Sequence, residues 1–385
     1  MPSFFKAPLC GSHRQACTHE PNGGPGAPTA RRAGAERGEG VPASDGDGGF
    51  GRAKPPGVDL TRREFIGAVS IPLLATACSR RPPYDPRQFT VPGRSDVALL
   101  PADSYDIDFA DVIGRGLREL AIDVRGRRVL LKPNMVEYEA GTAINTNPLV
   151  VIGTAVALRR AGAADVVVGE GPGHRRDTEY LLTKTGLFDH LREHRIRFVD
   201  LNEDDVEYVP LRSRFTGLER LALPVEVLRS DFIVSMPKLK THHWAGLTAS
   251  MKNFFGTVPG AVYGWPKNVL HIRGIEQSIL DLVATIRPHL AILDAVTAME
   301  GDGPIMGRPR KVGFVGMARD LAALDATAAR VIGLDPRKLP YISEARKFLG
   351  NIDESRIDQR GEPVARYASA FDIIDSFKPM RLGKL

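Results

Sequence analysis

Cysteine is nearly absent from this sequence: its 385 residues include only Cys10, Cys17 and Cys78. Because none follows position 78, the long C-terminal part can form neither a disulfide nor a thiolate-ligated metal or iron–sulfur site. A metal bound there would need His, Asp or Glu ligands, so the cofactor class left open is a divalent cation held through oxygen. We expect no iron–sulfur cluster in this chain.

A strong charge of either sign is also missing. The formal net charge is +6, and residues 79–385 contain 43 Lys and Arg against 39 Asp and Glu. Domains that bind nucleic acids usually carry a clear basic patch. A nucleic acid is therefore not an expected partner. With 43% hydrophobic and 25% charged residues, the composition is typical of a soluble globular protein.

The apolar run that ends at Cys78 has roughly a dozen residues, fewer than the about 20 that span a bilayer. Arg62 and Arg63 precede this run in "LTRREFIGAVSIPLLATAC". Paired arginines, a short apolar region and small residues at its end resemble a twin-arginine export signal. The alternative is a buried helix with two chance arginines. We expect residues 58–78 to be a signal peptide, and the twin-arginine export machinery to be a partner.

Processing of this signal has two open routes. The small residues 75–77 fit a cleavage site, whereas Cys78 resembles the acylated cysteine of a bacterial lipoprotein, although Ala75 stands where leucine is commonest. Both routes predict a location in the periplasm or at the outer face of the membrane, in the second case with a lipid anchor.

The signal divides the expected domains. Residues 1–57 are rich in Gly, Pro, Ala and Arg without a periodic apolar pattern, which is typical of disorder. They are alternatively an over-extended translation start, with initiation at a valine codon for Val58. A Pro-rich linker follows at 79–96, and residues 97–385 are expected to form a single domain.

Alternating strand-like and helix-like segments fill residues 97–385. Expected strands are "RVLLKPN", "DVVVGEG", "IRFVDLN", "DFIVSMP", "HLAILDAV" and "KVGFVGMA". Asn147 and Asp320 are expected N-caps of helices that stop at Gly162 and Gly333. Continuously apolar strands between amphipathic helices predict an α/β fold with a mostly parallel sheet covered by helices on both faces. Residues 205–225 interrupt the alternation and predict a small β insertion.

Polar side chains stand where several predicted strands end. In parallel sheets ligands bind beyond the carboxyl ends of the strands. We therefore expect one mixed-charge cleft at this edge, built from Lys132, Asn134, Glu170, Lys238, Lys240 and Asp294. The "GEGPGH" loop after the second strand lacks the third glycine of a dinucleotide fingerprint, so we interpret it as a turn.

The segment "SMPKLKTHHWAGLTASMKNFFG" is the most densely cationic of these strand ends. Lys238, Lys240 and His242 alternate along an extended run, and Thr248 is expected to cap a short helix that carries Lys252 and Asn253. Ammonium groups on rigid supports favour binding of a phosphate or carboxylate. The alternative is a solvated basic loop. A histidine here could act as an acid, a base or a single metal ligand.

Three carboxylates are candidates for a divalent metal site. Asp294 ends a strand, Glu300 follows in a glycine-rich loop, and Asp325 lies at the edge of a helix's apolar face. They are expected either to pair with the lysines or to hold a hard cation through oxygen.

Several segments resemble the bacterial and archaeal family known as domain of unknown function 362. They are "VLLKPN", "GEGPG", "DFIVSMPKLKTHHWAGLTASMKNFFG", "LDAVTAMEGDGPIMGRPRK" and "DLAALDATAARVIG", between about residues 97 and 333. The resemblance implies no assigned activity. Some members are described as iron–sulfur proteins, and this chain departs from them because its C-terminal part lacks cysteine. The positions that the resemblance marks coincide with the site residues chosen above.

Three hypotheses follow. The leading one is an exported α/β protein whose cleft binds a small anionic ligand: Lys132, Asn134, Lys238, Lys252 and Asn253 hold the anion, and His242, Lys240 and Glu170 do the chemistry. The second is a non-catalytic envelope lipoprotein for binding or assembly. The third is a redox accessory protein, suggested by the export route and by the iron–sulfur relatives.

Overall fold

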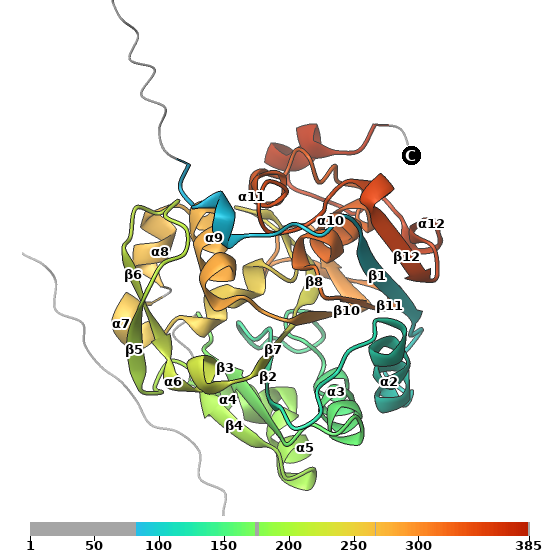
Figure 1. The fold of residues 1–385 in the computed structure, drawn as a ribbon. Coiled ribbons are helices and arrows are strands. Elements are labelled where there is room, and N and C mark those ends of the chain that lie inside the picture. Colours follow the sequence, from blue (N-terminus) through green and yellow to red (C-terminus); the bar gives the residue numbers. More distant parts are fainter. Residues whose placement is uncertain (1–81, 174–176, 266, 384–385) are drawn as a thin grey trace, which may run out of the picture. The chain divides into compact units, whose positions relative to one another are not determined.

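One large sheet forms the centre of the protein (Figure 1). In the computed structural model, residues 82–173, 177–265 and 267–383 are described, and all belong to one compact unit, Thr76–Leu385. The sheet has ten strands: β1 (Ser95–Pro101), β2 (Arg128–Pro133), β3 (Asp165–Glu170), β4 (Arg197–Asp200), β7 (Phe232–Met236), β8 (Lys238–His242), β9 (Gly246–Thr248), β10 (Leu290–Glu300), β11 (Arg308–Ala318) and β12 (Ile357–Gly361).

The strand order is β12-β1-β11-β10-β7-β2-β3-β4, and β8 pairs with β10 and β9. Strand β11 runs antiparallel to both of its neighbours, and β9 runs antiparallel to β8. The other pairs are parallel. The carboxyl ends of β1, β2, β3, β7 and β10 therefore lie at the same edge of the sheet, which we call the carboxyl edge.

Alternate side chains of each strand face two different cores, as the period of a strand requires. One core contains Val129, Leu131, Val234 and Ile292. Four helices cover it: α2 (Phe109–Glu119), α3 (Pro148–Arg160), α4 (Thr178–Thr185) and α5 (Leu187–Glu193).

The other core contains Leu130, Ile233 and Leu293 from the same strands. The elements that cover it are α6 (Val225–Arg229), α7 (Gly260–Tyr263), α8 (Asn268–Ile272), α9 (Ile275–Ile286), α10 (Leu321–Val331), α11 (Pro340–Ala345), α12 (Val364–Tyr367) and the 3-10 helices η2 (Lys252–Thr257) and η4 (Asp375–Met380). Figure 1 shows the two helical layers on opposite sides of the sheet. Short 3-10 turns also form at η1 (Pro86–Gln88) and η3 (Glu354–Arg356).

The predicted fold class is confirmed: the sheet is mostly parallel and helices cover both faces. Asn147 and Asp320 cap α3 and α10 as expected, because their side chains accept hydrogen bonds from Leu149 N (2.9 Å) and Ala323 N (3.0 Å). The β insertion is also present, as a separate antiparallel hairpin of β5 (Val206–Pro210) and β6 (Arg220–Pro224).

One local prediction is wrong. Thr248 does not cap a helix, because it lies in β9 opposite Lys240, and the following helix is a 3-10 turn that starts at Lys252. The backbone of Thr248 is instead engaged in strand pairing with β8. Met251, Phe254 and Phe255, which flank Lys252 and Asn253, are buried.

Among the described residues, no helix combines the length and the apolar character that crossing a membrane requires. Arg62, Arg63 and Cys78, on which the export and lipid-attachment predictions rest, lie outside the described residues, as do the expected boundaries at 57 and 78.

Candidate functional site

Polar and charged side chains gather at the carboxyl edge, in the interior of the protein. Lys132 and Glu170 come from the ends of β2 and β3, Lys238 and Lys240 come from β8, and Asp294 comes from β10. All five are buried. The strand-end reasoning therefore placed these residues together, but they form a buried network and not the exposed lip of a cleft.

Lys132 and Glu170 form an ion pair with almost no exposure to solvent, at 1% for each side chain. Lys132 Nζ lies 2.8 Å from Glu170 Oε1 and 2.7 Å from Oε2. The carboxylate also accepts hydrogen bonds from Met135 N and Gly171 N, both at 3.0 Å. Burial lowers the pKa of Lys132 and raises the pKa of Glu170, and the ion pair opposes both shifts. The pair is thus internally compensated.

Gly256 packs directly against this pair. A Cβ atom at this position would overlap Glu170 Oε1 and Lys132 Nζ. Only glycine lets the backbone of η2 approach the pair so closely.

Lys238 and Asp294 form a second compensated pair, and Tyr105, a residue that we did not predict, bonds to both of them. Lys238 Nζ lies 2.8 Å from Asp294 Oδ2 and donates to the hydroxyl of Tyr105 at 2.6 Å. That hydroxyl donates in turn to Asp294 Oδ1 at 2.9 Å, and Asn147 N donates to Oδ2. Burial lowers the pKa of Lys238 and Asp294 opposes the shift. Asp294 therefore pairs with a lysine, which is one of the two alternatives predicted for it.

Lys240 differs from both, because the described residues offer its side chain no ion pair. The Nζ atom donates to the carbonyl oxygen of Ile144 at 2.8 Å, and the side chain is fully buried. Burial lowers its pKa well below the ordinary value, and the neighbouring charges of Lys252 and Lys238 lower it further. Lys240 is accordingly a buried amine that is harder to protonate than an exposed lysine.

Lys252 and Lys267 are the other two amines near this network. Lys252 lies 5.4 Å from the ring centroid of Phe255, and burial lowers its pKa to about 8. Lys267 donates to Asn202 Oδ1 at 2.5 Å and to the carbonyl of Val258, and burial lowers its pKa to about 7. In the described part of the chain, neither is within ion-pairing distance of a carboxylate.

We call Lys132, Lys238, Lys240, Lys252 and Lys267 the lysine cluster. Two of its members are paired with carboxylates, and three rely on neutral acceptors or an aromatic ring. The interior of this edge therefore holds more amines than carboxylates paired with them. Burial is the main cause that lowers the pKa of the unpaired amines, neighbouring lysines lower it further, and a bound anion would oppose both effects.

His242 lies on β8 beside the cluster and is held as one tautomer. Its Nδ1 accepts hydrogen bonds from Trp244 N (3.0 Å) and Ala245 N (3.2 Å). A neutral ring with an accepting Nδ1 carries its proton on Nε2. Burial, followed by the charge of Lys252, lowers the pKa of His242 well below 6.5. The residue is therefore a neutral hydrogen-bond donor at Nε2 near pH 7.

The two predicted asparagines link the strands. Asn253 donates to the carbonyl of Lys132 at 2.9 Å and to Ser235 Oγ at 3.2 Å, and its Oδ1 accepts from Asn134 Nδ2. Asn134 Oδ1 is buried and has no hydrogen-bond partner in the described structure. Asn253 therefore holds η2 against the ends of β2 and β7.

The three carboxylates predicted as metal ligands do not converge. Asp294 pairs with Lys238, whereas Glu300 binds Arg308 and Arg310 at 3.0 and 2.6 Å. Burial raises the pKa of Glu300, but hydrogen bonds from Asp372 N and these arginines outweigh it and hold that pKa below its ordinary value. The described residues contain no group of three or more His, Cys, Asp or Glu side chains suited to a metal ion.

Asp325 has a structural partner of its own. Its carboxylate accepts hydrogen bonds from Ser250 N (2.7 Å) and Met251 N (3.1 Å), and burial raises its pKa to about 7. This side chain therefore fixes the backbone that leads into η2. The expected sharing of a cation by Asp294, Glu300 and Asp325 is wrong in its geometry, because each carboxylate is already engaged by a different donor.

Three contributors were missed at the sequence level. Tyr105 follows β1 and Asn202 follows β4, so the strand-end argument would have found both if it had been extended to every strand. Lys267 follows no strand and enters from the loop before α8, with a positive φ of 68°. No pattern in the sequence marks it.

Comparison with known proteins identifies the family of this chain. A family model described as a domain of unknown function (DUF362) matches residues 129–330, which include every member of the lysine cluster. The chain belongs to this family. The chain is also similar to the thylakoid-associated protein of Synechocystis sp., with 30% identity over 232 residues covering 58% of this chain and 68% of the relative.

Solved structures with partial similarity include the lactate racemase apoprotein from Thermoanaerobacterium thermosaccharolyticum, with a TM-score of 0.41 and 12% identity. The match covers 63% of this chain and 57% of the racemase chain. A Thermotoga maritima protein gives a TM-score of 0.34 and 13% identity over 55% of this chain and 56% of its own. This DUF362 chain thus spans less than two thirds of either solved chain.

Proposed function

We propose that the lysine cluster of this DUF362 protein binds a small anion bearing a phosphate or carboxylate group. The observation that carries the proposal is Lys240, a fully buried amine whose one hydrogen bond within the described structure is to a neutral carbonyl. Burial without a carboxylate partner makes this amine costly to protonate, and a bound anion would supply the missing partner. Lys252 and Lys267 add two further unpaired amines.

Lys252 marks the place where the cluster comes nearest to solvent. Lys252 is partly exposed. Beside it a chain of aromatic rings leads outward: the His242 and His243 centroids are 4.9 Å apart, and the His243 and Trp244 centroids are 4.7 Å apart. Trp244 is 58% exposed. We propose that the anion enters here, meets Lys252 first and then Lys240.

Catalysis would use the two neutral groups of this site. Lys240, as a free amine, would accept a proton from the bound substrate, and His242 would donate from Nε2 to a developing negative charge. Glu170 would act indirectly by fixing Lys132, which contributes positive charge. A divalent metal is not needed in this scheme.

Ligand-induced stabilisation tests the proposal. The melting temperature of the full chain is measured with inorganic phosphate, sulfate and a series of mono- and dicarboxylates at constant ionic strength. We expect at least one anion to raise the melting temperature. At one hundred times its Kd, a bound anion adds about 2.7 kcal/mol to the unfolding free energy.

Lys240→Met should abolish this shift, whereas Lys184→Met, at an exposed position on α4, should leave it unchanged. If no anion stabilises the parent protein, or if the Lys240 variant responds as the parent does, the cluster is structural and the proposal is wrong.

For location, we propose export by the twin-arginine machinery with a lipid at Cys78. The support is the sequence alone: Arg62 and Arg63, the short apolar run and the small residues before Cys78. Palmitate labelling of the parent and of Cys78→Ala tests lipidation, and Arg62→Lys with Arg63→Lys tests the route. A labelled Cys78 variant would contradict the anchor, and unaltered export of the double lysine variant would contradict the route.

A further inference from the structure

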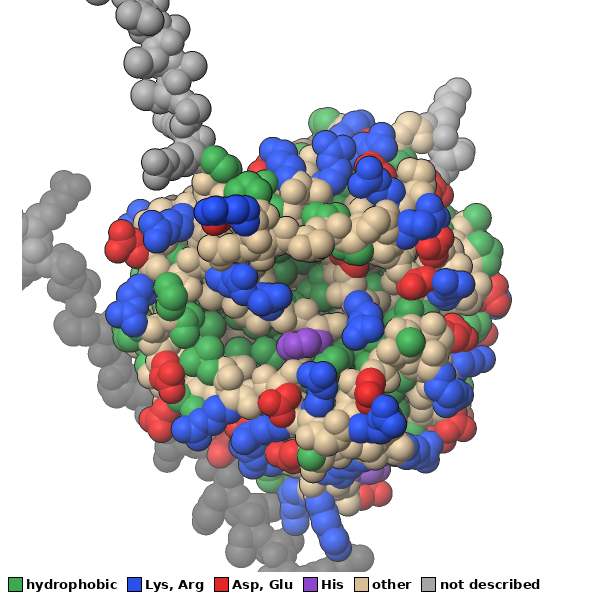
Figure 2. Space-filling view, viewed as in Figure 1, with side chains coloured by type: hydrophobic (Ala, Val, Ile, Leu, Met, Phe, Trp, Pro, Cys, Tyr) green, Lys and Arg blue, Asp and Glu red, His purple; other side chains and the backbone are tan. Residues whose placement is uncertain are grey.

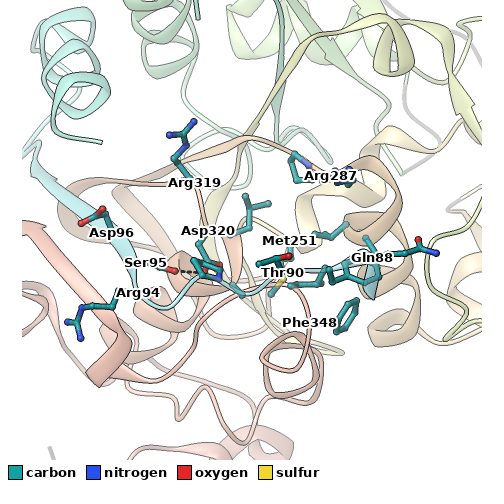
Figure 3. Close-up of a pocket in the computed structure, with 18 of the residues that line it drawn as sticks. Gln88, Thr90, Arg94, Ser95, Asp96, Met251, Arg287, Arg319, Asp320 and Phe348 are labelled. Carbon is teal, nitrogen blue, oxygen red and sulfur yellow. Dashed lines mark hydrogen bonds between the residues drawn. The ribbon is translucent and has the colours of Figure 1, made fainter. Parts of the chain in front are cut away.

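A cavity of about 370 Å³ lies at the edge of the sheet opposite the lysine cluster. Its lining comes from the segment before β1, the end of α9, the start of α10 and residues 348–349, with Leu120 and Met251 in addition. These are the amino end of β1 and the segments that precede β10 and follow β11. Figure 3 shows the lining residues, and Figure 2 shows a hollow on this face with Lys and Arg side chains on both sides. The volume is within the range of small-molecule sites, about 300–1,000 Å³.

The floor of this cavity is apolar. Met251, Val283, Leu321 and Phe348 line it and are each at most 6% exposed. An apolar chain placed against them would leave water, and each buried methylene contributes about 0.8 kcal/mol to such a transfer.

The rim, by contrast, carries positive charge that is not engaged. Arg287 and Arg319 line the cavity, both are exposed, and in the described structure neither side chain has a hydrogen bond or ion pair. The other charged lining residues are occupied: Arg94 pairs with Asp358, Asp96 pairs with Arg360, and Asp320 accepts from Ser95, Asn351 and Ala323.

Both arginines lie near His289. The pKa of His289 is lowered by burial and, beyond that, by the charges of Arg127, Arg287 and Arg319. A guanidinium binds carboxylates and phosphates through two parallel hydrogen bonds, and two of them at one rim favour an anionic head group.

From the apolar floor and the two free arginines, we infer that this cavity binds an amphipathic organic anion. The head group sits at Arg287 and Arg319, and the alkyl or aryl body lies against Met251, Val283, Leu321 and Phe348. The site is separate from the lysine cluster and does not depend on the function proposed for it.

Isothermal titration calorimetry of the full chain with n-alkyl carboxylates from butanoate to decanoate tests the inference, with 1-octanol as the uncharged match for octanoate. We expect Kd to fall about fourfold per added methylene until the cavity is full. Octanol should bind at least tenfold more weakly than octanoate.

The variants separate the two halves of the site. Arg287→Gln with Arg319→Gln should weaken octanoate at least tenfold and leave octanol nearly unchanged, and Arg192→Gln on α5 serves as the matched control. Thr90→Trp, at an exposed lining position, should block both ligands. Binding that does not depend on chain length, or that survives the double arginine change, overturns the inference. Displacement of octanoate by inorganic phosphate at equal concentration would also do so, because a purely polar ion gains nothing from the floor.

Discussion

Replacing Glu170 with glutamine probes the buried ion pair most directly. In the parent protein the carboxylate receives four hydrogen bonds, two from Lys132 Nζ at 2.7 and 2.8 Å and one each from Met135 N and Gly171 N. The glutamine amide turns an NH₂ group toward some of these donors. It also leaves Lys132 buried without a negative partner, although Asn253 Oδ1 and the carbonyl of Pro133 still accept from Nζ.

The size of the loss follows from two limits. Removing one member of a buried pair typically costs about 3–5 kcal/mol. Lys132 escapes part of this cost by releasing its proton. Starting from an ordinary pKa of 10.5, release at pH 7 costs about 4.8 kcal/mol, and at pH 9 about 2 kcal/mol. We therefore expect Glu170→Gln to lower the unfolding free energy by about 3–5 kcal/mol at pH 7, and by clearly less at pH 9.

Urea unfolding at pH 7 and pH 9 measures this difference against the parent at each pH, so that titration of the other lysines largely cancels. Lys132→Met added to Glu170→Gln should recover part of the loss, because the uncompensated ammonium is gone. Glu179→Gln, at an exposed position on α4, is the control and should change little. A loss below about 1 kcal/mol that is equal at both pH values would refute the reasoning, since a solvated pair behaves in that way.

Further predictions concern the neighbours of this pair. Gly256→Ala should destabilise the protein by about 1–3 kcal/mol through overlap with the pair, measured by urea unfolding, and an unchanged midpoint would contradict the close approach. The pKa of Asp325 is about 7 in the folded protein, against an ordinary value of 3.8, so this residue contributes stability below pH 3.8 that is lost as pH rises through 7. The unfolding free energy of Asp325→Asn should therefore decline less than that of the parent between pH 4 and 7. Parallel curves for the two proteins would contradict this. Because Lys252 has a pKa of about 8, binding of an anion at pH 8.5 should take up protons, and calorimetry in two buffers of different ionisation enthalpy should detect it; no buffer dependence would count against contact with Lys252. Tyr105→Phe should cost about 1–3 kcal/mol in thermal unfolding, and a neutral result would show that its hydroxyl is dispensable.

Local sequence rules worked where the responsible interaction is local. Asn147 and Asp320 cap helices because each side chain reaches a backbone N–H two or three residues ahead. The same reasoning failed at Thr248, because the competing interaction was a strand pairing with Lys240, which no local pattern shows. Glu300 was misplaced for a similar reason: its arginine partners face it only after β10 and β11 pair.

The sequence by itself determined the α/β class, the parallel strands and the edge at which charged side chains gather, since period, capping and strand ends depend on neighbours along the chain. It also determined that cysteine chemistry is absent after residue 78. Only the tertiary structure decided which charges are compensated. Lys132 and Lys238 form ion pairs with carboxylates, and Lys240 donates to a carbonyl oxygen. The side chains of Arg287 and Arg319 have no hydrogen bond or ion pair among the described residues. Pairing depends on distances of a few ångströms between segments far apart in the sequence, and those distances exist only once the chain has folded.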